Sequence, residues 1–316
     1  MKKFKILYIA AVASLLAACA NEEDGIGNSS PVAATIQANI SKTVTRATVG
    51  NTWSENDAIG VYASSGVITK EDNKKYITKN GDGTFEADGN DNVIYFKDNK
   101  KTTFSAYYPY SESLTDGKMD WIMSEVEEKQ PCKADVLFAS GATASKASPT
   151  VKFTDAEHRF KHCMSLVKFV IKPGFGIDQA ENILLGIRLN DIYKTGKFNT
   201  KTGAIEPGQY RTSFPYTFNT SFDKESSVEV IMLPQSLEND MMEIEVDLQV
   251  GDEYNTYKTT LIPTTDYQFK GGYKYTYVIT VNNTKITVAE ADIQEWETAP
   301  QGNLEAELEE ESCSWI

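Results

Sequence analysis

The residues of this chain that could bind a metal or act as nucleophiles include two histidines and four cysteines. The candidate set for a zinc site is Cys132, His158, His162 and Cys163. Their spacing matches no common zinc motif, and a packed strand end with a buried cysteine is the preferred interpretation. The sequence also lacks an HExxH motif, a Gly-x-Ser-x-Gly elbow and a phosphate-binding loop. It therefore predicts no enzyme, no metal site and no cofactor.

Cys19 lies in the sequence context of a lipid attachment site. Three lysines precede the apolar run Ile6–Leu16, and Ala17-Ala18-Cys19 follows. The run is shorter than the about 20 apolar residues of a membrane-spanning helix, and its end resembles a bacterial lipobox, in which the cysteine after the cleavage point takes lipid such as palmitate. We expect residues 1–18 to be a lipoprotein signal peptide and Cys19 the lipid anchor; the alternative is a chance cysteine in an ordinary signal peptide. The sequence does not say which pair, if any, forms a disulfide among Cys132, Cys163 and Cys313.

Arg46 is a candidate site of proteolytic processing. Small or extended residues flank it in Thr43-Val44-Thr45 and Ala47-Thr48, which suits binding of an exposed segment in a protease cleft, and the arginine offers a charge-specific anchor. Cleavage between Arg46 and Ala47 would remove Thr35–Ser41, where apolar and polar residues alternate as in a β-strand. The alternative is an ordinary surface arginine.

The last residues have the pattern of an extended segment. After Pro300-Gln301-Gly302, the apolar residues Leu304, Ala306 and Leu308 alternate with glutamates. This alternation puts the apolar side chains on one face, as is required to fill a sheet groove in a neighbouring molecule. Removal of the residues up to Arg46 would open such a groove by deleting an edge strand, so the tail is a candidate donor strand. A short helix or an acidic disordered tail fits the same residues.

Composition favours an all-β protein of about two domains. The 316 residues are 41% hydrophobic and 24% charged, which are values of globular proteins. Sixteen tyrosines and fourteen phenylalanines lie mostly in short runs with Val, Ile and Thr, and these runs are separated by Asn, Asp and Gly. The formal net charge of −14 argues against a nucleic-acid partner.

Strands are expected where apolar and polar residues alternate between turns. The expected strands are Ala58–Ala63, Lys75–Thr78, Thr84–Ala87, Val93–Phe96, Thr102–Tyr108, Ala134–Ala139, Leu166–Lys172, Asn182–Leu189, Ser227–Leu233, Glu243–Val250, Tyr257–Ile262 and Lys274–Val281. Ser140–Pro149 is the best linker candidate, and a boundary near Pro173–Gly176 is the alternative. The expected core residues are Ile59, Val61, Val167, Phe169, Val230, Met232, Tyr275 and Tyr277.

Several short motifs follow one another in a recognisable order. They are Trp53 with Asp57–Tyr62, Phe104–Pro109, Asp135–Ala139, Phe160–Val170, Leu233–Gln235, and Tyr273–Tyr277 with Ile293 and Trp296. Together they resemble the fimbrillin family of Bacteroides-type surface proteins, over nearly the whole mature chain. The resemblance implies two transthyretin-like β-sandwich domains in series, export as a lipoprotein, and assembly into type V pili by strand exchange after a trypsin-like protease cuts behind an arginine. The ranges expected on this basis are a tether with a removable strand at 19–46, sandwiches at 47–150 and 151–302, and the tail at 303–316.

The expected function is therefore that of a structural pilus subunit that serves adhesion. The resemblance implies as partners other pilin subunits, of the same or another kind, the processing protease, the outer membrane through the lipid, and a surface ligand on a host or another bacterium. The acidic cluster Asn21–Asp24 is similar to one that sends such lipoproteins to the outer face of the outer membrane, although a solvated tether explains it equally.

The alternative function is that of a monomeric surface lipoprotein that binds glycans. Tyr107, Tyr108, Tyr110 and Trp121 could form a platform on which sugar rings stack. Such aromatic residues are more often packed inside a sandwich with their polar tips in water.

Overall fold

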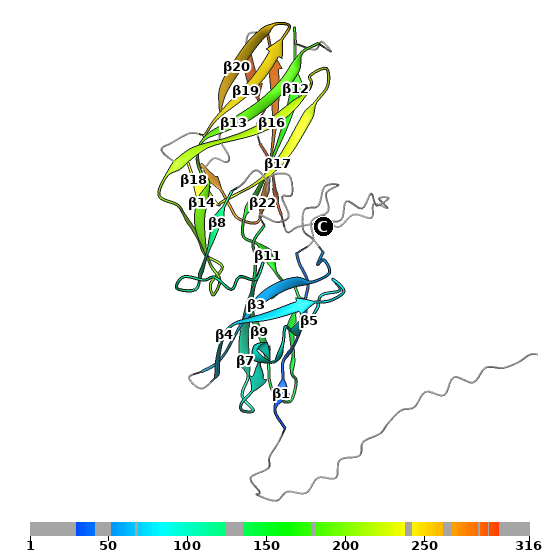
Figure 1. The fold of residues 1–316 in the computed structure, drawn as a ribbon, viewed down its shortest axis with the longest axis vertical. Coiled ribbons are helices and arrows are strands. Elements are labelled where there is room, and N and C mark those ends of the chain that lie inside the picture. The colour runs from blue at the N-terminus through cyan, green and yellow to red at the C-terminus, as the bar shows by residue number, and fades with distance from the viewer. Residues whose placement is uncertain are drawn as a thin grey trace, which may run out of the picture. The chain divides into compact units, whose positions relative to one another are not determined.

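The protein is built from β-strands (Figure 1). The structure is a computed structural model that describes residues 30–41, 52–66, 69–123, 135–177, 181–237, 242–261, 267–283, 285–289 and 291–296. Within these ranges the helical element is the short 3-10 helix η1 (Asn90–Asn92). The expected all-β class is confirmed.

The first sheet wraps around a hydrophobic core of its own. Its strand order is β10 (Thr150–Phe153), β2 (Thr35–Ala38), β5 (Thr84–Ala87), β4 (Thr69–Thr78), β3 (Asp57–Ser65), β7 (Thr102–Tyr108), β9 (Leu137–Ala144) and β11 (Lys161–His162). Val151 in β10, at one end of this order, and Leu137 in β9, next to the other end, belong to one buried cluster. The sheet must therefore curl around that cluster, which we call the first core and which also contains Trp53 and Phe160.

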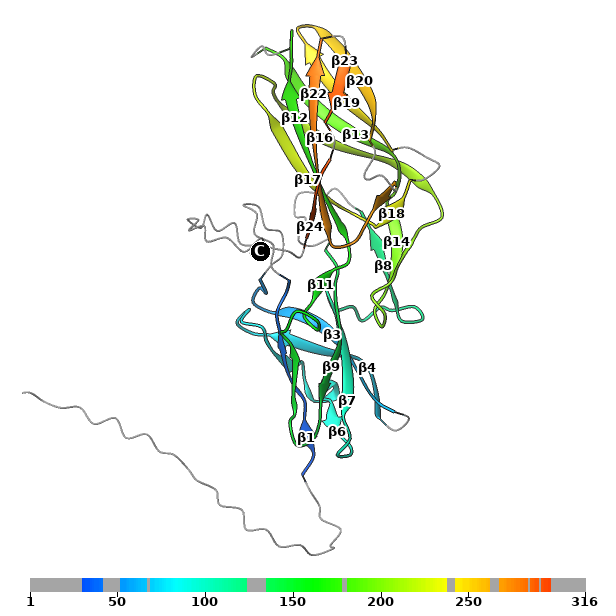
Figure 2. The same cartoon turned by 180° about the vertical axis from the view of Figure 1, so that it is seen from behind.

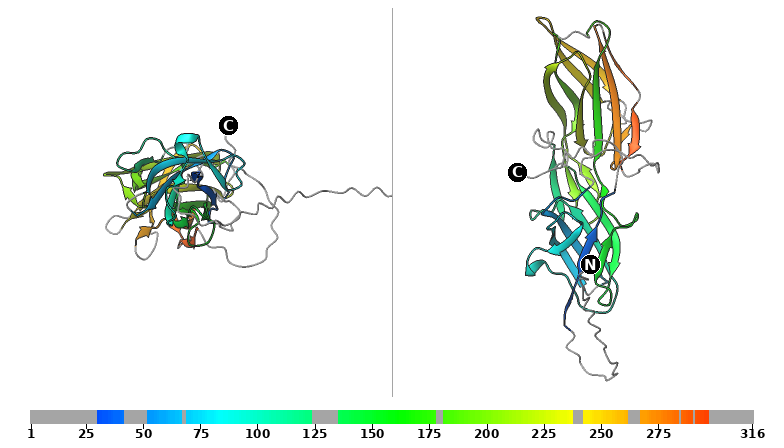
Figure 3. Two further views of the ribbon diagram at one scale, coloured as in Figure 1. Left: turned by 90° about the horizontal axis from the view of Figure 1, so that it is seen from below. Right: turned by 90° about the vertical axis from the view of Figure 1, so that its right-hand side faces the viewer.

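Two further sheets pack their apolar faces together. One has the order β17 (Ser226–Met232), β12 (Ser165–Pro173), β22 (Tyr273–Asn282) and β23 (Lys285–Val288), and β24 (Asp292–Glu295) also pairs with β22. The other has the order β16 (Arg211–Ser221), β13 (Ile183–Tyr193), β19 (Met242–Val250) and β20 (Glu253–Leu261). Figure 2 shows these strands from behind, and Figure 3 shows green β12 beside orange β22, to which it is paired in parallel.

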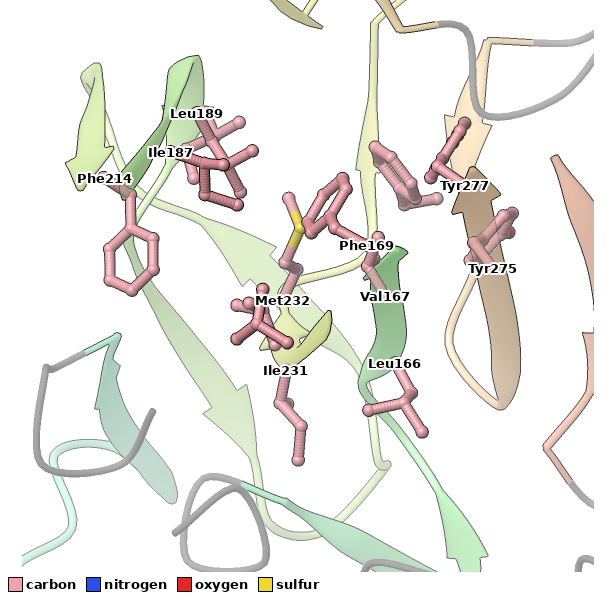
Figure 4. Close-up of a cluster of buried hydrophobic side chains, with 14 of the residues drawn as sticks. Leu166, Val167, Phe169, Ile187, Leu189, Phe214, Ile231, Met232, Tyr275 and Tyr277 are labelled. Carbon is pink, nitrogen blue, oxygen red and sulfur yellow. The ribbon is translucent and has the colours of Figure 1, made fainter. Parts of the chain in front are cut away.

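Alternate residues of both sheets fill one cluster, which we call the second core (Figure 4). Phe169 of β12 and Tyr277 of β22 stack with their ring centroids 5.9 Å apart, and Ile187 and Leu189 enter from β13. Because side chains alternate across a strand, the charged residues between these positions lie on the outward faces.

Strand pairing joins the first half of the chain to the second core. β8 (Lys118–Ile122) pairs with β14 (Thr195–Asn199), which in turn pairs with β15 (Ile205–Pro207). Trp121 of β8 is buried in the second core, and Tyr62 Oη of β3 lies 2.6 Å from Thr200 Oγ1. Smaller pairs are β1 (Val32–Ala33) with β6 (Tyr95–Phe96), and β18 (Gln235–Ser236) with β21 (Gln268–Phe269).

The predicted strands and core agree well with the structure. Each expected strand overlaps an observed one, and β5 and β7 match residue for residue. The eight expected core residues are all buried. β16 was not expected, although Phe214, Tyr216 and Phe218 alternate with exposed residues, because Pro215 lies within this run and a proline argues against a strand.

The expected linker at Ser140–Pro149 is wrong. β9 continues to Ala144, and Ser145 and Ser148 then exchange backbone hydrogen bonds of 3.0 Å before β10 begins. The small residues have a structural reason: Gly141 adopts φ +85°, which favours glycine, at the bulge where the β7–β9 register shifts, and Ala142 is buried. A stretch that looks like a flexible connection is therefore a bulged strand and a tight turn.

Candidate functional site

The segment ahead of Arg46 is an integral part of the first core. Ala34, Ile36, Ala38 and Ile40 are buried, whereas Thr35, Gln37 and Asn39 between them are exposed. This is the period-two pattern of a strand that lies with one face on a core, so the alternation in the sequence correctly predicted β2.

β2 lies between two strands rather than at an edge, which corrects the expectation of an edge strand. It pairs in parallel with β10, where Ile36 is opposite Val151, and antiparallel with β5, where Ile36 is opposite Phe85. The reason is that β10 returns alongside β2 and covers the side that would otherwise be free. Without β2, both β10 and β5 would lose a partner.

Backbone hydrogen bonds extend the attachment beyond β2. Ala38 N–H donates to Gly83 O at 2.8 Å, Asn39 N–H to Phe153 O at 2.9 Å and Ser41 N–H to Phe160 O at 2.9 Å. Gly83 lies so close to the strand that a Cβ added to it would meet Ala38 O at 2.5 Å. The Asn80–Gly83 turn was recognisable in the sequence, but the close approach to β2 was not.

Trp53, which follows Arg46 in the sequence, binds the segment that precedes Arg46. Its Nε1–H donates to Ala38 O at 2.8 Å, and its ring makes edge contacts with Phe85 and Phe160 at centroid distances of 5.0 and 5.1 Å. The indole therefore satisfies a backbone acceptor of the strand while it fills the apolar space beneath it.

Each histidine lies beside an aspartate. His162 is buried in β11 with its Nδ1 2.7 Å from Asp135 Oδ2, and its ring stacks on Trp296 at a centroid distance of 4.0 Å. His158 lies beside Asp155, and this contact lowers the pKa of the Asp155 carboxyl. Among the residues that the structure describes, no group of three or more His, Cys, Asp or Glu side chains is placed to hold a metal ion.

The four aromatic residues proposed as a sugar platform do not form an exposed surface together. Tyr107 and Trp121 are buried, and Tyr108 donates its hydroxyl to Asp57 Oδ1 at 3.1 Å. Burial raises the pKa of the Tyr107 and Tyr108 hydroxyls above their ordinary value. Tyr107 and Trp121 therefore pack the second core, and Tyr108 packs against the first.

The predicted modification and donor residues lie outside the described residues. They are Cys19, Arg46, Ala47, Leu304, Ala306 and Leu308, and the same holds for Cys132 and Cys313. Within the described ranges there is no helix with the length and apolar character that crossing a membrane requires.

Comparison with known proteins agrees with this architecture. A curated relative, the proposed fimbrium subunit Fim1C of Bacteroides uniformis, is 25% identical over 251 residues, which cover 78% of this chain and 79% of the relative. A solved structure of a proposed cell adhesion protein from Bacteroides ovatus matches with a TM-score of 0.65 and 22% identity over 86% of this chain and all of that one. A fimbrial protein from Bacteroides vulgatus matches with a TM-score of 0.56 and 17% identity over 83% of this chain and 99% of the other. These two structures share the fold.

The sequence pattern of the fimbrillin-like family matches residues 45–296, which include the first core's strands from β3 onward and the whole second core. The chain belongs to the fimbrillin-like family.

Proposed function

We propose that the chain is a structural subunit of a cell-surface pilus that serves adhesion, and that subunits join by strand exchange after cleavage behind Arg46. The family supports the first part: its members are fimbrial structural and adhesion proteins, not enzymes, and associate with other pilin subunits. The observation that carries the second part is the position of β2, a strand ahead of Arg46 that completes the first core.

Cleavage behind Arg46 followed by release of β2 would leave a groove in need of a strand. The side chains of Ile36, Ala38 and Ile40 would leave apolar space over Phe85 and Val151. The carbonyls that now accept from β2 and the residues after it would lose their donors, which is costly for buried backbone groups. Open strand edges of this kind favour replacement by another strand.

The C-terminal tail has the side-chain sizes that the groove requires. Ile36, Ala38 and Ile40 alternate large, small and large at every second position, and Leu304, Ala306 and Leu308 do the same. An extended tail could therefore place its leucines where the isoleucines lie now, with its glutamates in solvent as Gln37 and Asn39 are. This match supports the tail of one subunit as the donor for the next.

The export and domain assignments belong to the same proposal. Residues 1–18 are the signal peptide, Cys19 carries the lipid at the outer membrane, and a trypsin-like protease removes the segment up to Arg46. Two transthyretin-like domains, expected at 47–150 and 151–302, are built around the first and second cores. The first core also takes in Val151, Phe153 and Phe160, so residues beyond 150 contribute to the first domain.

Mass spectrometry of the chain taken from the surface of the native cell tests the processing step. Assembled molecules are expected to begin at Ala47. An Arg46→Gln variant should remain unprocessed and monomeric, whereas the matched control Lys42→Gln should be processed normally. If all wild-type molecules still begin at a lipidated Cys19, strand exchange after cleavage is excluded and the monomeric glycan-binding alternative gains.

A further inference from the structure

The outward face of the β16-β13-β19-β20 sheet contains a hollow of about 420 Å³ that is independent of the proposed strand-exchange groove. Its side chains include Arg188, Thr217, Asn219, Asp247, Tyr254 and Thr256. The volume lies in the range of small-ligand sites, and these side chains can form many hydrogen bonds.

A β-bulge with a glycine creates the hollow. The register of β13 against both β16 and β19 shifts between Leu184 and Gly186. Gly186 therefore leaves an outward position without a side chain, opposite Thr217 on one neighbour and Asp247 on the other. A Cβ at Gly186 would meet Tyr216 O at 2.5 Å, so this floor cannot be filled by a larger residue without moving the strands.

The charges around the hollow compensate one another. Arg188 of β13 forms ion pairs with Glu245 and, at 3.5 Å, with Asp247. Lys258 of β20 pairs with the same Glu245. Thr256 Oγ1–H donates to Asp247 Oδ1 at 2.6 Å. Since the arginine is already paired with carboxylates, the hollow has no excess positive charge to select an anion.

Tyr254 supplies an exposed aromatic surface at the same place. Its side chain is 74% exposed and lies on β20 opposite Gln249 of β19. A tyrosine ring in this position offers an apolar face and a polar tip. β13 and β19 each have a partner on both sides, so a peptide could not add here as another strand.

We propose that this hollow binds a neutral carbohydrate of one or two sugar rings. The hydroxyls of the sugar would exchange hydrogen bonds with the Arg188 guanidinium, the Asp247 carboxylate and the Asn219 amide, which are planar groups that can contact two neighbouring oxygens or hydroxyls. The apolar face of the sugar ring would pack on Tyr254. Carbohydrate recognition of this kind extends the proposed pilus role by a ligand site, and it does not depend on strand exchange.

Saturation-transfer NMR on the protein purified from the cell surface tests the proposal. The probes are galactose, mannose, fucose, N-acetylglucosamine, lactose and, as the charged comparison, N-acetylneuraminic acid. At least one neutral sugar is expected to bind with a dissociation constant in the millimolar range, since a single hexose has only about 12 non-hydrogen atoms to contribute.

Tyr254→Ala should weaken that binding about tenfold, as expected for loss of an aromatic anchor. The matched control is Tyr210→Ala, which changes a tyrosine that is 79% exposed and does not line the hollow, and its binding should equal that of the wild type. An unchanged far-UV circular dichroism spectrum shows that each variant is folded. The proposal is overturned if no neutral sugar binds, if only the charged sugar binds, or if Tyr254→Ala binds as tightly as the wild type.

Discussion

Trp53 shows how a single side chain holds the segment before Arg46 against the first core. It follows the proposed cleavage site in the sequence but holds Ala38 on the other side of that site, through its Nε1–H. In the proposed cleavage, Trp53 would stay with the folded body while Ala38 would leave with the removed segment. The indole holds the segment before cleavage and, if the proposed cleavage removes that segment, would line the groove that it leaves.

Replacement of Trp53 by phenylalanine should loosen this segment selectively. The aromatic packing is largely kept, but the hydrogen bond to Ala38 O is lost, at a cost of about 0.5–1.5 kcal/mol. Native-state hydrogen exchange should report faster opening at the amides of Asn39 and Ser41, and unchanged exchange at Val230 in the second core. Equal acceleration at all three amides would show that Trp53 stabilises the whole molecule rather than this segment.

Glu245 gives the second core a predictable response to acid. The hydrogen bond and charge of Lys258, with the charge of Arg188, hold the pKa of the Glu245 carboxyl below its ordinary value of 4.5. A carboxyl whose pKa is lower in the folded state stabilises the fold above its unfolded pKa, and this contribution is lost as the pH falls towards the folded pKa. The wild type should therefore lose stability below pH 4.5 in part through this group.

Urea unfolding at neutral pH and below pH 4.5 measures this contribution. Glu245→Gln should lose less stability on acidification than the wild type, because glutamine does not titrate. Glu253→Gln, which changes an exposed glutamate at the start of β20, is the control and should behave as the wild type. Identical acid responses of Glu245→Gln and wild type would contradict the assigned role of the ion pairs.

Among the strands, β2 is expected to contribute strongly to the stability of the uncleaved chain. Ile36 is fully buried, so Ile36→Ala should lower the free energy of unfolding by about 2–5 kcal/mol. The neighbouring exposed residue serves as the control, and Gln37→Ala should stay within about 0.5 kcal/mol of the wild type. Both are measured by denaturant unfolding of uncleaved protein; a loss as small as that of the control would mean that β2 is not part of the cooperative core.

Strands whose own side chains alternate could be predicted from the sequence. The place of a strand in its sheet, and a bulge against its neighbour, depend on the partner strand and could not. β2, β5 and β7 were evident from period-two patterns. The position of β2 inside the sheet was not, because parallel pairing with β10 is a contact between residues more than a hundred positions apart. The bulged end of β9 was mistaken for a linker, since Gly141 and its small neighbours look alike in both settings.

The same limit applies to the candidate sites. The strand ahead of Arg46, whose release is proposed to open a groove, could be anticipated, because Arg46 and the alternation before it are local features of the sequence. The hollow beside Tyr254 could not, because Arg188, Asn219 and Asp247 come from three strands and meet only through the bulge at Gly186.

In the assembled pilus, strand exchange would bring the C-terminal tail of one subunit to the N-terminal groove of the next. Residues 34–40, ahead of Arg46, complete the first core of their own subunit, and the tail that contains Leu304, Ala306 and Leu308 has side-chain sizes that match the core of another. Every subunit would then carry one acceptor groove and one donor strand, which is a head-to-tail arrangement that produces filaments instead of closed dimers.

The most direct test compares Arg46-cleaved full-length protein with cleaved protein truncated after Gly302, on gels under denaturing conditions. The full-length protein should form ladders that resist denaturant, because the inserted strand is part of the folded core. The truncated protein should run as a monomer and form no ladder, and its far-UV circular dichroism spectrum before denaturation should show that it is folded. Normal ladders from the truncated protein would contradict the donor role of the tail, and the absence of ladders from the full-length protein would contradict strand exchange itself.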